Sequence, residues 1–452
     1  MTESAGLGFY DGNVLTITRS GNTIYAGGKF TVAGGTFARN IAKWTGGKWE
    51  ALGEGYENGI RGSVYAILVD GNDIYAGGYF GSAGTSEAYH IAKFDGTRWR
   101  SLGIGVGGVP GAYVKSLVKV GDYLYVAGYF SVVGDEENYE LPTNSIARFN
   151  LVTNRWESLG RGIEYVYGIP GVVNDMDVYE NRIFVGGEFQ SADDMYFHNF
   201  VVIEENKFTG IGGIQNVGIE GKVKTVKYLN NEIYIGGYLQ LQLKGESYGI
   251  LKWDADQWVK LNEQLQSDQG DVIVNDIEPY KDGIIAGGIF SRAGNSVFNN
   301  LAYYDGEKWN DLAGGVLPGV SNLAVLEEDI FVSGPLVISA GKSACVAMAR
   351  YFKDKLSGVE KESDEKRQAG ITNFPNPFTQ STSIYYSLSS PGKVKITVTD
   401  GLGREIKIVI NEFQDPGNYV INFDAQNLPA GLYFCHLSQG NKFETKKMLV
   451  VK

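Results

Sequence analysis

The chain repeats a short glycine-containing motif, which first occurs as IYAGGKF at Ile24–Phe30. The motif returns with changes at six later places: IYAGGYF at 74–80, LYVAGYF at 124–130, IFVGGEF at 183–189, IYIGGYL at 233–239, IIAGGIF at 284–290 and IFVSGPL at 330–336. Successive copies begin 46 to 59 residues apart and together occupy about the first 350 residues. A recurring period of this length is the sequence signature of a repeat architecture.

Each copy predicts four short strands, which we name a to d. The motif is strand b. An apolar segment such as 64–69 precedes it as strand a, and segments such as those in IAKFDGTRWRSLG (91–103) follow as strands c and d. Short turns such as Asp70-Gly71 and Asp95-Gly96 separate a from b and c from d, which is typical of antiparallel hairpins. Such sheets bury both faces when they are arranged around an axis. The sequence therefore predicts an all-β fold with a seven-bladed β-propeller of four-stranded antiparallel blades, in which each glycine pair lies where strand b packs closely on its neighbour.

The repeats resemble the Kelch repeat, in which an apolar strand ends in Gly-Gly and an aromatic residue and then a Trp follow. The third copy, IARFNLVTNRWESLG at 146–160, is the most similar. The fourth copy departs from the pattern with Phe208 in place of the Trp, and the seventh with Ser333-Gly334 and Leu356. The resemblance covers residues 1–352 and implies a Kelch-like propeller, a fold that most often serves as a binding platform.

A different pattern begins at residue 371. Alternating segments such as KVKITVTD (393–400) and LYFCHLS (432–438) are punctuated by glycine and proline, which predicts a small Ig-like antiparallel β-sandwich over 371–452. Between the two patterns, KDKLSGVEKESDEKRQAG at 353–370 alternates charges and predicts a solvated linker. The alternative for this stretch is a charged helical turn at the end of the seventh repeat. The expected domains are a propeller at 1–352, a linker at 353–370 and the sandwich at 371–452.

The tail resembles the type A sorting domain that directs proteins through the type IX secretion system. Four motifs carry the resemblance in order: NFPNPF (373–378), DGLGR (400–404), LPAGLY (428–433) and KKMLVVK (446–452). The residues expected to form the sorting signal are Asn373, Pro375, Asn376, Pro377, Asp400, Gly403, Arg404, Leu428, Pro429, Gly431, Tyr433, Lys446 and Lys452.

This resemblance implies export from a Bacteroidota cell, through the periplasm, to the cell surface or the extracellular space. The implied partners are the type IX translocon, an outer-membrane shuttle protein and, in many members of the family, a surface sortase that cleaves near the domain boundary. Such cargo carries a secretory leader. The first residues, MTESAGLGFY, lack the basic and apolar regions of a leader, so we expect the leader to be absent from this chain.

The composition excludes several classes of partner. The net charge is −12, from 40 basic and 52 acidic residues, which argues against nucleic acid or an anionic membrane surface. No apolar run reaches the roughly 18 residues of a spanning helix, so we expect no membrane insertion. With three His and no metal-binding or nucleophile motif, the sequence predicts no metal and no cofactor. We expect His90 and His198 in turns or in the core, and Cys345 and Cys435 as free thiols.

The long insertions of the repeats fall in the b–c and d–a connections, which emerge on one face of the predicted propeller. Function usually resides in such loops on a rigid scaffold. These connections are rich in tyrosine, whose ring gives a large amphipathic contact area at low entropic cost. The sequence therefore predicts a secreted or surface binding protein for a glycan or, second, a protein. The alternative for about half of these tyrosines is packing inward under the loops. The predicted ligand-binding residues are Tyr89, Tyr113, Tyr139, Tyr165, Tyr167, Tyr196 and Tyr248.

An enzyme is the alternative function. Copies four and six share Val-Asn-Asp at the start of strand a, which places Asp175 and Asp276 near the predicted central channel. Two carboxylates can divide the acid and base roles of a carbohydrate-active hydrolase or lyase. A bound cation and a solvent-lined channel are the other interpretations of these two residues. A binding function is favoured, because the equivalent positions in the other copies are small or uncharged.

Overall fold

The computed structural model describes residues 9–351 and 371–451, with gaps at 11, 46, 212–218, 242–245, 269, 295, 313–314, 318, 335–336, 340–341, 346–347, 375–377, 389, 416, 427 and 441. The predicted linker and the sorting residues Pro375, Asn376, Pro377 and Lys452 lie outside the described residues. The chain divides into two compact units: unit 1 comprises Met1–Val337 and Cys345–Lys353, and unit 2 comprises Ile338–Ala344 and Asp354–Lys452. In the described ranges, strands and one short 3-10 helix (η1, Gly55–Glu57) make up the regular structure, which confirms the predicted all-β class.

Unit 1 consists of antiparallel sheets in which strands a to d are neighbours in chain order, as the hairpin turns predict. The first six repeats have all four strands, with β10 (Ser86–Glu87) added in the second, and the described part of the seventh has three. Strand a is β2 (Asn13–Ser20), β8 (Ile60–Asp70), β14 (Tyr113–Val120), β22 (Val172–Tyr179), β28 (Ile219–Leu229), β33 (Ile273–Tyr280) and β40 (Asn322–Leu326). Strand b is β3 (Thr23–Lys29), β9 (Asp73–Ala83), β15 (Tyr123–Tyr129), β23 (Arg182–Glu188), β29 (Glu232–Leu241), β34 (Gly283–Ile289) and β41 (Asp329–Ser333). Strand c is β6 (Ile41–Thr45), β11 (Ile91–Phe94), β18 (Ile146–Asn150), β26 (Phe200–Glu204), β30 (Ser247–Asp254), β37 (Leu301–Tyr304) and β44 (Met348–Tyr351). Strand d is β7 (Lys48–Ala51), β12 (Trp99–Ser101), β19 (Arg155–Ser158), β27 (Lys207–Thr209), β31 (Gln257–Lys260) and β38 (Trp309–Asp311).

The glycine pair of strand b marks two close approaches, which Gly186 and Gly187 illustrate. A Cβ atom on Gly186 would lie 2.4 Å from Cγ1 of Val223, in strand a of the next sheet. A Cβ atom on Gly187 would lie 2.0 Å from the carbonyl oxygen of Val172, in strand a of its own sheet. Because a side chain at either position would overlap these atoms, only glycine fits. The predicted close packing of strand b at the glycine pair is confirmed.

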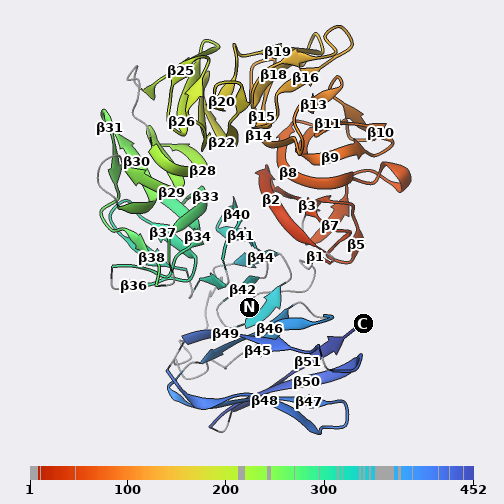
Figure 1. The fold of residues 1–452 in the computed structure, drawn as a ribbon, viewed down its shortest axis with the longest axis vertical. Helices are drawn as coiled ribbons and strands as arrows, with labels where there is room; N and C mark the ends of the chain where they lie inside the picture. The colour runs from red at the N-terminus through yellow and green to blue at the C-terminus, as the bar shows by residue number, and fades with distance from the viewer. Residues whose placement is uncertain are drawn as a thin grey trace. The chain divides into compact units, whose positions relative to one another are not determined.

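The a strands of consecutive sheets lie side by side and close into a ring. β2 contacts β8, β8 contacts β14, and the series continues through β22, β28 and β33 to β40, which contacts β2. Figure 1 shows the sheets of unit 1 in chain order around a common centre, with the a strands innermost. Two hydrogen bonds join the ends of the ring: Asn322 Nδ2 donates to the Leu15 carbonyl at 3.0 Å, and Arg19 Nη1 donates to the Val325 carbonyl at 3.3 Å. Unit 1 therefore has a β-propeller-like all-β fold.

An asparagine just before strand c joins one sheet to the next in several repeats. Asn40, Asn199 and Asn300 have φ between 60° and 63°, the left-handed conformation that Asn adopts more readily than most residues. The side-chain oxygen of Asn199 accepts the Phe189 N–H at 2.8 Å, and its amide nitrogen donates to the Ile219 carbonyl of the next sheet at 2.7 Å. Asn40 and Asn300 make the corresponding bonds. We call these three residues the inter-sheet asparagines.

The tryptophan of strand d makes a second link between sheets. The indole N–H groups of Trp99, Trp156 and Trp309 donate to main-chain carbonyls of the preceding repeat, at Leu52, Leu102 and Glu263, over 3.2, 3.1 and 3.0 Å. Phe208 occupies the corresponding place in the fourth repeat and is buried, but it has no N–H to donate. In these three repeats the Trp therefore combines a buried apolar ring with a hydrogen bond to the neighbouring sheet.

Many of the b–c and d–a connections differ from the prediction, because they form a second tier of small sheets instead of loops. In the third repeat, the hairpin of β16 (Val132–Gly134) and β17 (Leu141–Pro142) pairs with β13 (Gly105–Gly107), which lies in the connection before it. Such pairing satisfies backbone N–H and C=O groups that a buried loop would leave unpaired. The other short strands are β1 (Phe9–Tyr10), β4 (Val32–Ala33), β5 (Thr36–Phe37), β20 (Ile163–Val166), β21 (Ile169–Pro170), β24 (Ser191–Ala192), β25 (Met195–Tyr196), β32 (Leu265–Gln266), β35 (Arg292–Ala293), β36 (Ser296–Val297), β39 (Val316–Leu317), β42 (Val337–Ser339) and β43 (Lys342–Cys345).

Unit 2 contains two antiparallel sheets with a shared apolar core. One sheet has the order β45 (Ile371–Phe374), β46 (Ser381–Leu388), β49 (Gly417–Asp424), and the other the order β48 (Glu405–Gln414), β47 (Gly392–Asp400), β50 (Gly431–Gln439), β51 (Lys442–Val450). Ile384 and Phe423 of the first sheet and Val398 and Leu437 of the second belong to one buried cluster. Cys435 is a free, buried thiol in this core, and burial raises its pKa to about 12.

The described sorting residues have structural roles at the turns of unit 2. The Asp400 carboxylate accepts the Leu402 and Arg404 N–H groups and the Arg404 guanidinium at 2.7 to 3.0 Å. Gly403 in this turn has a φ of 81°, which disfavours any other residue. Asp400 pairs across the sheet with Tyr433, whose hydroxyl donates to the Pro429 carbonyl at 2.9 Å. The DGLGR and LPAGLY motifs therefore meet in space and close adjacent turns.

Candidate functional site

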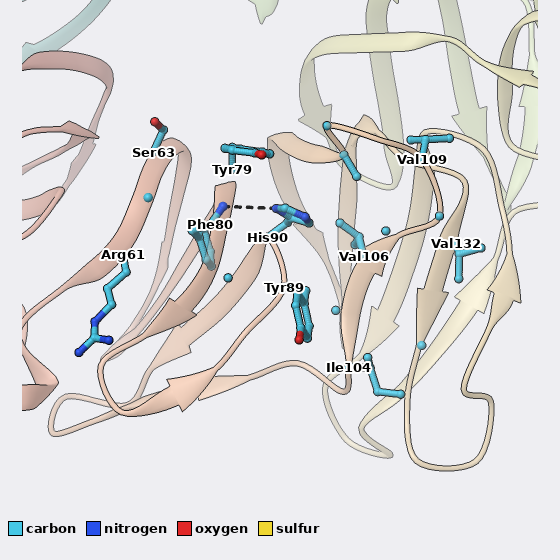
Figure 2. Close-up of a pocket in the computed structure, with 18 of the residues that line it drawn as sticks. Arg61, Ser63, Tyr79, Phe80, Tyr89, His90, Ile104, Val106, Val109 and Val132 are labelled. Carbon is cyan, nitrogen blue, oxygen red and sulfur yellow. Dashed lines mark hydrogen bonds between the residues drawn. The ribbon is translucent and has the colours of Figure 1, made fainter.

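Unit 1 carries a pocket on its small-sheet tier, built from the first three repeats. Its volume is 910 Å³, which falls within the range of about 300–1,000 Å³ that is usual for small-molecule sites. The walls come from the ends of β8 and β9, from the turn before β11, from the connection at 104–112 and from the hairpin of the third repeat. Figure 2 shows Arg61, Tyr79, Tyr89, His90 and Val106 around it. We call it the tyrosine pocket.

Three partly exposed tyrosine rings line the tyrosine pocket. Tyr79 is 52% exposed, Tyr89 47% and Tyr139 75%. Tyr79 follows the glycine pair of β9 at an outward-facing position of the strand. The Tyr89 carbonyl accepts the Val106 N–H at 3.1 Å, and both residues line the pocket. Of the predicted ligand-binding residues, the structure thus brings Tyr89 and Tyr139 together.

His90 also lines the pocket, beside the first of these rings. The Tyr79 and His90 rings are stacked, with centroids 5.6 Å apart and an interplanar angle of 22°. His90 Nδ1 accepts the Phe80 N–H at 3.3 Å. Burial lowers the pKa of His90 from its usual 6.5, and contact with the Gly78 carbonyl offsets part of that effect. His90 occupies the turn position that the sequence predicts, and it also lines the pocket.

Glycine keeps the pocket open. A Cβ atom on Gly81 or Gly107 would meet no other atom within 4 Å, and neither residue has the positive φ that would exclude a side chain. Both residues line the pocket, and neither narrows it with a side chain. Arg61, Lys29 and Glu140, which are exposed, give the rim both signs of charge.

Tyr165, Tyr167 and Tyr196 form a separate surface patch that does not line the tyrosine pocket. All three are more than half exposed, as the sequence analysis expects. The Arg161 guanidinium lies 4.1 Å from the centroid of the Tyr167 ring and donates to its hydroxyl at 3.1 Å. The Tyr196 ring contacts His198 edge-on, with centroids 5.1 Å apart. This patch sits on the hairpin of β20 and β21 and on β25.

For two of the predicted ligand-binding tyrosines, Tyr248 and Tyr113, the structure differs from the prediction. Tyr248 is 5% exposed, because strand c of the fifth repeat begins at Ser247 and turns the Tyr248 ring into the core. Its hydroxyl donates to Glu246 at 2.6 Å. Tyr113 begins β14 and is half-buried, with Tyr65 and Tyr129 rings 5.7 and 6.0 Å from it. Both residues belong to the strands and not to exposed connections.

Asp175 and Asp276 are partly buried and tie the a strands of neighbouring sheets together. The Asp175 carboxylate accepts the N–H of Met176 at 2.9 Å and that of Val226, in the next sheet, at 3.0 Å. Asp276 likewise accepts the N–H of Leu323 at 2.6 Å. Burial raises the pKa of Asp175 to about 6, and burial together with nearby Glu278 raises that of Asp276.

These bonds give both carboxyls a structural part, while the hydrolase alternative stays a prediction. No group of three or more His, Cys, Asp or Glu side chains is placed to hold a metal ion within the described ranges.

Two residues of the pocket, Tyr79 and His90, are not among the ligand-binding residues that the sequence predicts. Tyr79 was assigned to strand b, but its position varies among the motif copies, with Lys29, Glu188 and Ile289 at equivalent places. Variation at one place in an otherwise constant strand indicates a side chain that faces solvent. His90 stands where three other repeats have an inter-sheet asparagine, and that difference is also readable in the sequence.

Comparison with known proteins identifies the tail. Residues 372–452 match the secretion system C-terminal sorting domain. The tail is a type IX secretion sorting domain. A sorting domain at this place indicates interaction with the type IX secretion machinery and export to the cell surface or extracellular space. No curated protein matches the chain in sequence. Among the described residues, no helix is both long enough and apolar enough to cross a bilayer.

Several solved structures match the chain weakly. PorZ, an essential bacterial surface component of the type-IX secretion system of Porphyromonas gingivalis, is 15% identical, with a TM-score of 0.43 over 99% of this chain and 60% of PorZ. A protein of unknown function from Bacteroides thetaiotaomicron is 14% identical, with a TM-score of 0.37 over 77% of this chain and 73% of that one. A glycoside hydrolase family 43 arabinoxylan arabinofuranohydrolase from Bacillus subtilis is 10% identical, with a TM-score of 0.24 over 77% of this chain and 96% of the enzyme. This chain thus spans about 60% of the length of PorZ, and the likenesses are too weak to transfer a function.

Proposed function

We propose that the protein is a cell-surface glycan-binding protein of a Bacteroidota cell. In this proposal a Kelch-like, seven-bladed propeller at 1–352 binds the glycan, the linker at 353–370 separates it from the tail, and an Ig-like, type A sorting domain at 371–452 directs export. The closed ring of a strands supports the propeller, and the two-sheet core of unit 2 supports the sandwich.

The tyrosine pocket is the observation that carries the glycan proposal. A sugar ring has apolar C–H faces and a polar rim, so a site for it needs exposed aromatic faces beside hydrogen-bonding groups. Tyr79, Tyr89 and Tyr139 supply the aromatic faces, and Arg61 and Glu140 supply polar groups at the rim. The open glycine positions leave room for a ring to lie against them.

A glycan array probed with the full chain tests the proposal. The hits are then quantified by calorimetry with soluble hexasaccharides of glucose, xylose and mannose. Tyr79→Ala and Tyr139→Ala are each expected to weaken binding about tenfold, since truncated aromatic anchors commonly cost more than 1 kcal/mol. Gly107→Trp is expected to abolish binding by filling the cavity, while leaving the thermal transition unchanged because a Cβ atom at this position meets no other atom within 4 Å.

The tyrosine patch outside the pocket offers the matched control. Tyr165→Ala and Tyr196→Ala remove equally exposed rings and are expected to bind glycan as the unchanged protein does. Absence of any glycan binding, or binding that survives Gly107→Trp, overturns the proposal. Loss of glycan binding in Tyr165→Ala and Tyr196→Ala alone would place the glycan site on the other patch and overturn its assignment to the tyrosine pocket.

A separate experiment tests whether unit 2 directs the protein to the cell surface. We propose that an outer-membrane shuttle protein and the translocon read unit 2, and that a surface sortase cleaves within the linker. Deletion of Ile371–Lys452 is expected to leave unit 1 folded but retained in the periplasm of the native host, because the sorting domain is gone. Appearance of the shortened chain in the medium or on the surface would refute this assignment.

A further inference from the structure

We propose that His90 is the hydrogen-bond donor of the tyrosine pocket, and that the group it recognises is a hydroxyl or ring oxygen of a sugar held against Tyr79. This inference rests on the proposed glycan function and names the atom that selects the ligand.

The repeats themselves supply the first argument. The backbone at His90 is the same as at the inter-sheet asparagines: its N–H donates to the Phe80 carbonyl at 2.9 Å, its carbonyl accepts the Gly78 N–H at 3.0 Å, and its φ is 68°. Asn199 makes the same pair of bonds with Phe189 and Gly187. The second repeat has therefore kept the turn and changed only the side chain.

The His90 side chain also differs from the inter-sheet asparagines in its hydrogen bonding to the next sheet. Asn40, Asn199 and Asn300 each donate from the side chain to a carbonyl of the next sheet, over 2.7 to 2.8 Å. The equivalent carbonyl for His90 is that of Val106, since the Val106 N–H donates to Tyr89 as the Ile219 N–H does to His198. No hydrogen bond joins the His90 ring to Val106, although both residues are described. The side chain at this position has thus exchanged an inter-sheet bond for a place in the pocket wall.

The tautomer follows from the bond that His90 does make. Because Nδ1 accepts the Phe80 N–H, the neutral imidazole carries its proton on Nε2. Figure 2 shows the edge of the ring away from Phe80 turned toward Val106 and the pocket. Burial keeps the ring neutral at pH 7, because it lowers the pKa of His90. The pocket wall therefore holds an uncharged imidazole with one N–H beside the stacked Tyr79 ring, and donation to a sugar hydroxyl would take the place of the ring's contact with the Gly78 carbonyl.

His90→Asn is the decisive variant, because it restores the residue of the other repeats. Its amide is expected to donate to Val106 as the inter-sheet asparagines do, so the fold is kept while the donor is withdrawn from the pocket. For whichever glucose, xylose or mannose hexasaccharide binds the full chain, His90→Asn is expected to weaken affinity about 3- to 10-fold, the usual contribution of one neutral hydrogen bond. His198→Asn, a histidine outside the pocket, is the matched control and is expected to leave affinity unchanged.

Nitrogen NMR of the histidine rings gives a measurement that does not depend on a known ligand. The expected spectrum at pH 7 shows His90 protonated on Nε2 only, and titration with the hexasaccharide shifts that signal before those of His198 and His436. Protonation of Nδ1 in the free protein, or equal affinity of His90→Asn and the unchanged chain, overturns the inference while leaving the glycan proposal standing. Failure of the unchanged chain to bind any glycan overturns both.

Discussion

Replacement of Asn199 by Ala should cost unit 1 about 3–5 kcal/mol of stability, because three separate effects combine at this position. The buried Phe189 N–H loses its acceptor, and the carbonyls of Ile219 and Gly221 lose a donor at 2.7 and 3.1 Å. An orphaned buried group costs about 1–3 kcal/mol. Ala must also adopt a φ of 60°, which costs about 1–2 kcal/mol for a residue with a Cβ.

Two further variants separate these contributions. Asn199→Gly removes the same hydrogen bonds but tolerates the left-handed backbone, so it should cost about 2–3 kcal/mol, less than the Ala variant. Asn154→Ala provides the control, since Asn154 has a φ of 55° in an exposed turn and no hydrogen bond from its side chain within the described residues. It should lose only the backbone contribution, about 1–2 kcal/mol.

Urea unfolding followed by tryptophan fluorescence measures these changes in unit 1 alone. All seven tryptophans lie between residues 44 and 309, so unit 2 contributes no signal. The expected order of the free energies of unfolding is unchanged protein, Asn154→Ala, Asn199→Gly, Asn199→Ala. If both Asn199 variants fall within about 1 kcal/mol of the unchanged protein, the inter-sheet asparagines do not hold the sheets together and the reasoning fails.

Three other predictions follow from single contacts. Trp156→Phe should destabilise unit 1 by about 1–2 kcal/mol more than Trp49→Phe in the same urea assay, since Trp156 donates to Leu102 at 3.1 Å whereas the buried Trp49 indole has no hydrogen-bond partner among the described residues; equal losses would contradict the role of the indole bond. Folding raises the pKa of the Asp175 carboxyl from 3.8 to about 6, so its stabilising contribution is complete below pH 3.8 and is lost as the pH rises through 6. The stability of the unchanged protein relative to Asp175→Asn should therefore fall by up to about 3 kcal/mol between pH 4 and 7, and a difference that is flat or rises with pH would refute the burial of this carboxyl. The Cys435 thiol should resist alkylation in a folded Cys345→Ser chain at pH 8 and react once the chain is unfolded in urea, because burial raises its pKa to about 12; rapid reaction of the folded chain would count against this core.

The sequence predicts the strands and their order well, because the signal is local and repeated. The glycine pair at Gly186-Gly187, the turns between strands and the Trp of strand d each reflect contacts within one repeat or with the adjacent one, so every copy shows them. The sorting motifs can also be recognised from the sequence, since Asp400 and Tyr433 make their hydrogen bonds within turns of a few residues. Both the all-β class and the sorting domain could therefore be read without coordinates.

The exposure of the tyrosines could not be predicted from the sequence. Tyr139 and Tyr248 both lie near b–c connections and look alike in the sequence, but one is 75% exposed and the other is core. The difference depends on where strand c begins and on which short strands pair in the second tier, and neither is a property of the local sequence. Because successive side chains of a strand point to opposite faces, a shift of one residue in the strand exchanges its buried and exposed positions.

By itself, then, the sequence determined the repeat, the strand order within each sheet and the nature of the tail, because these rest on patterns a few residues long. Only the tertiary structure decided that Arg61, Tyr79, His90 and Tyr139 share one pocket, because they come from separate strands and connections of two repeats. The same holds for His90. Its neighbours show that it stands where other repeats have an inter-sheet asparagine, and that its imidazole lines the pocket instead of bonding to the next sheet. A binding site made by the packing of distant segments has no local signature to read.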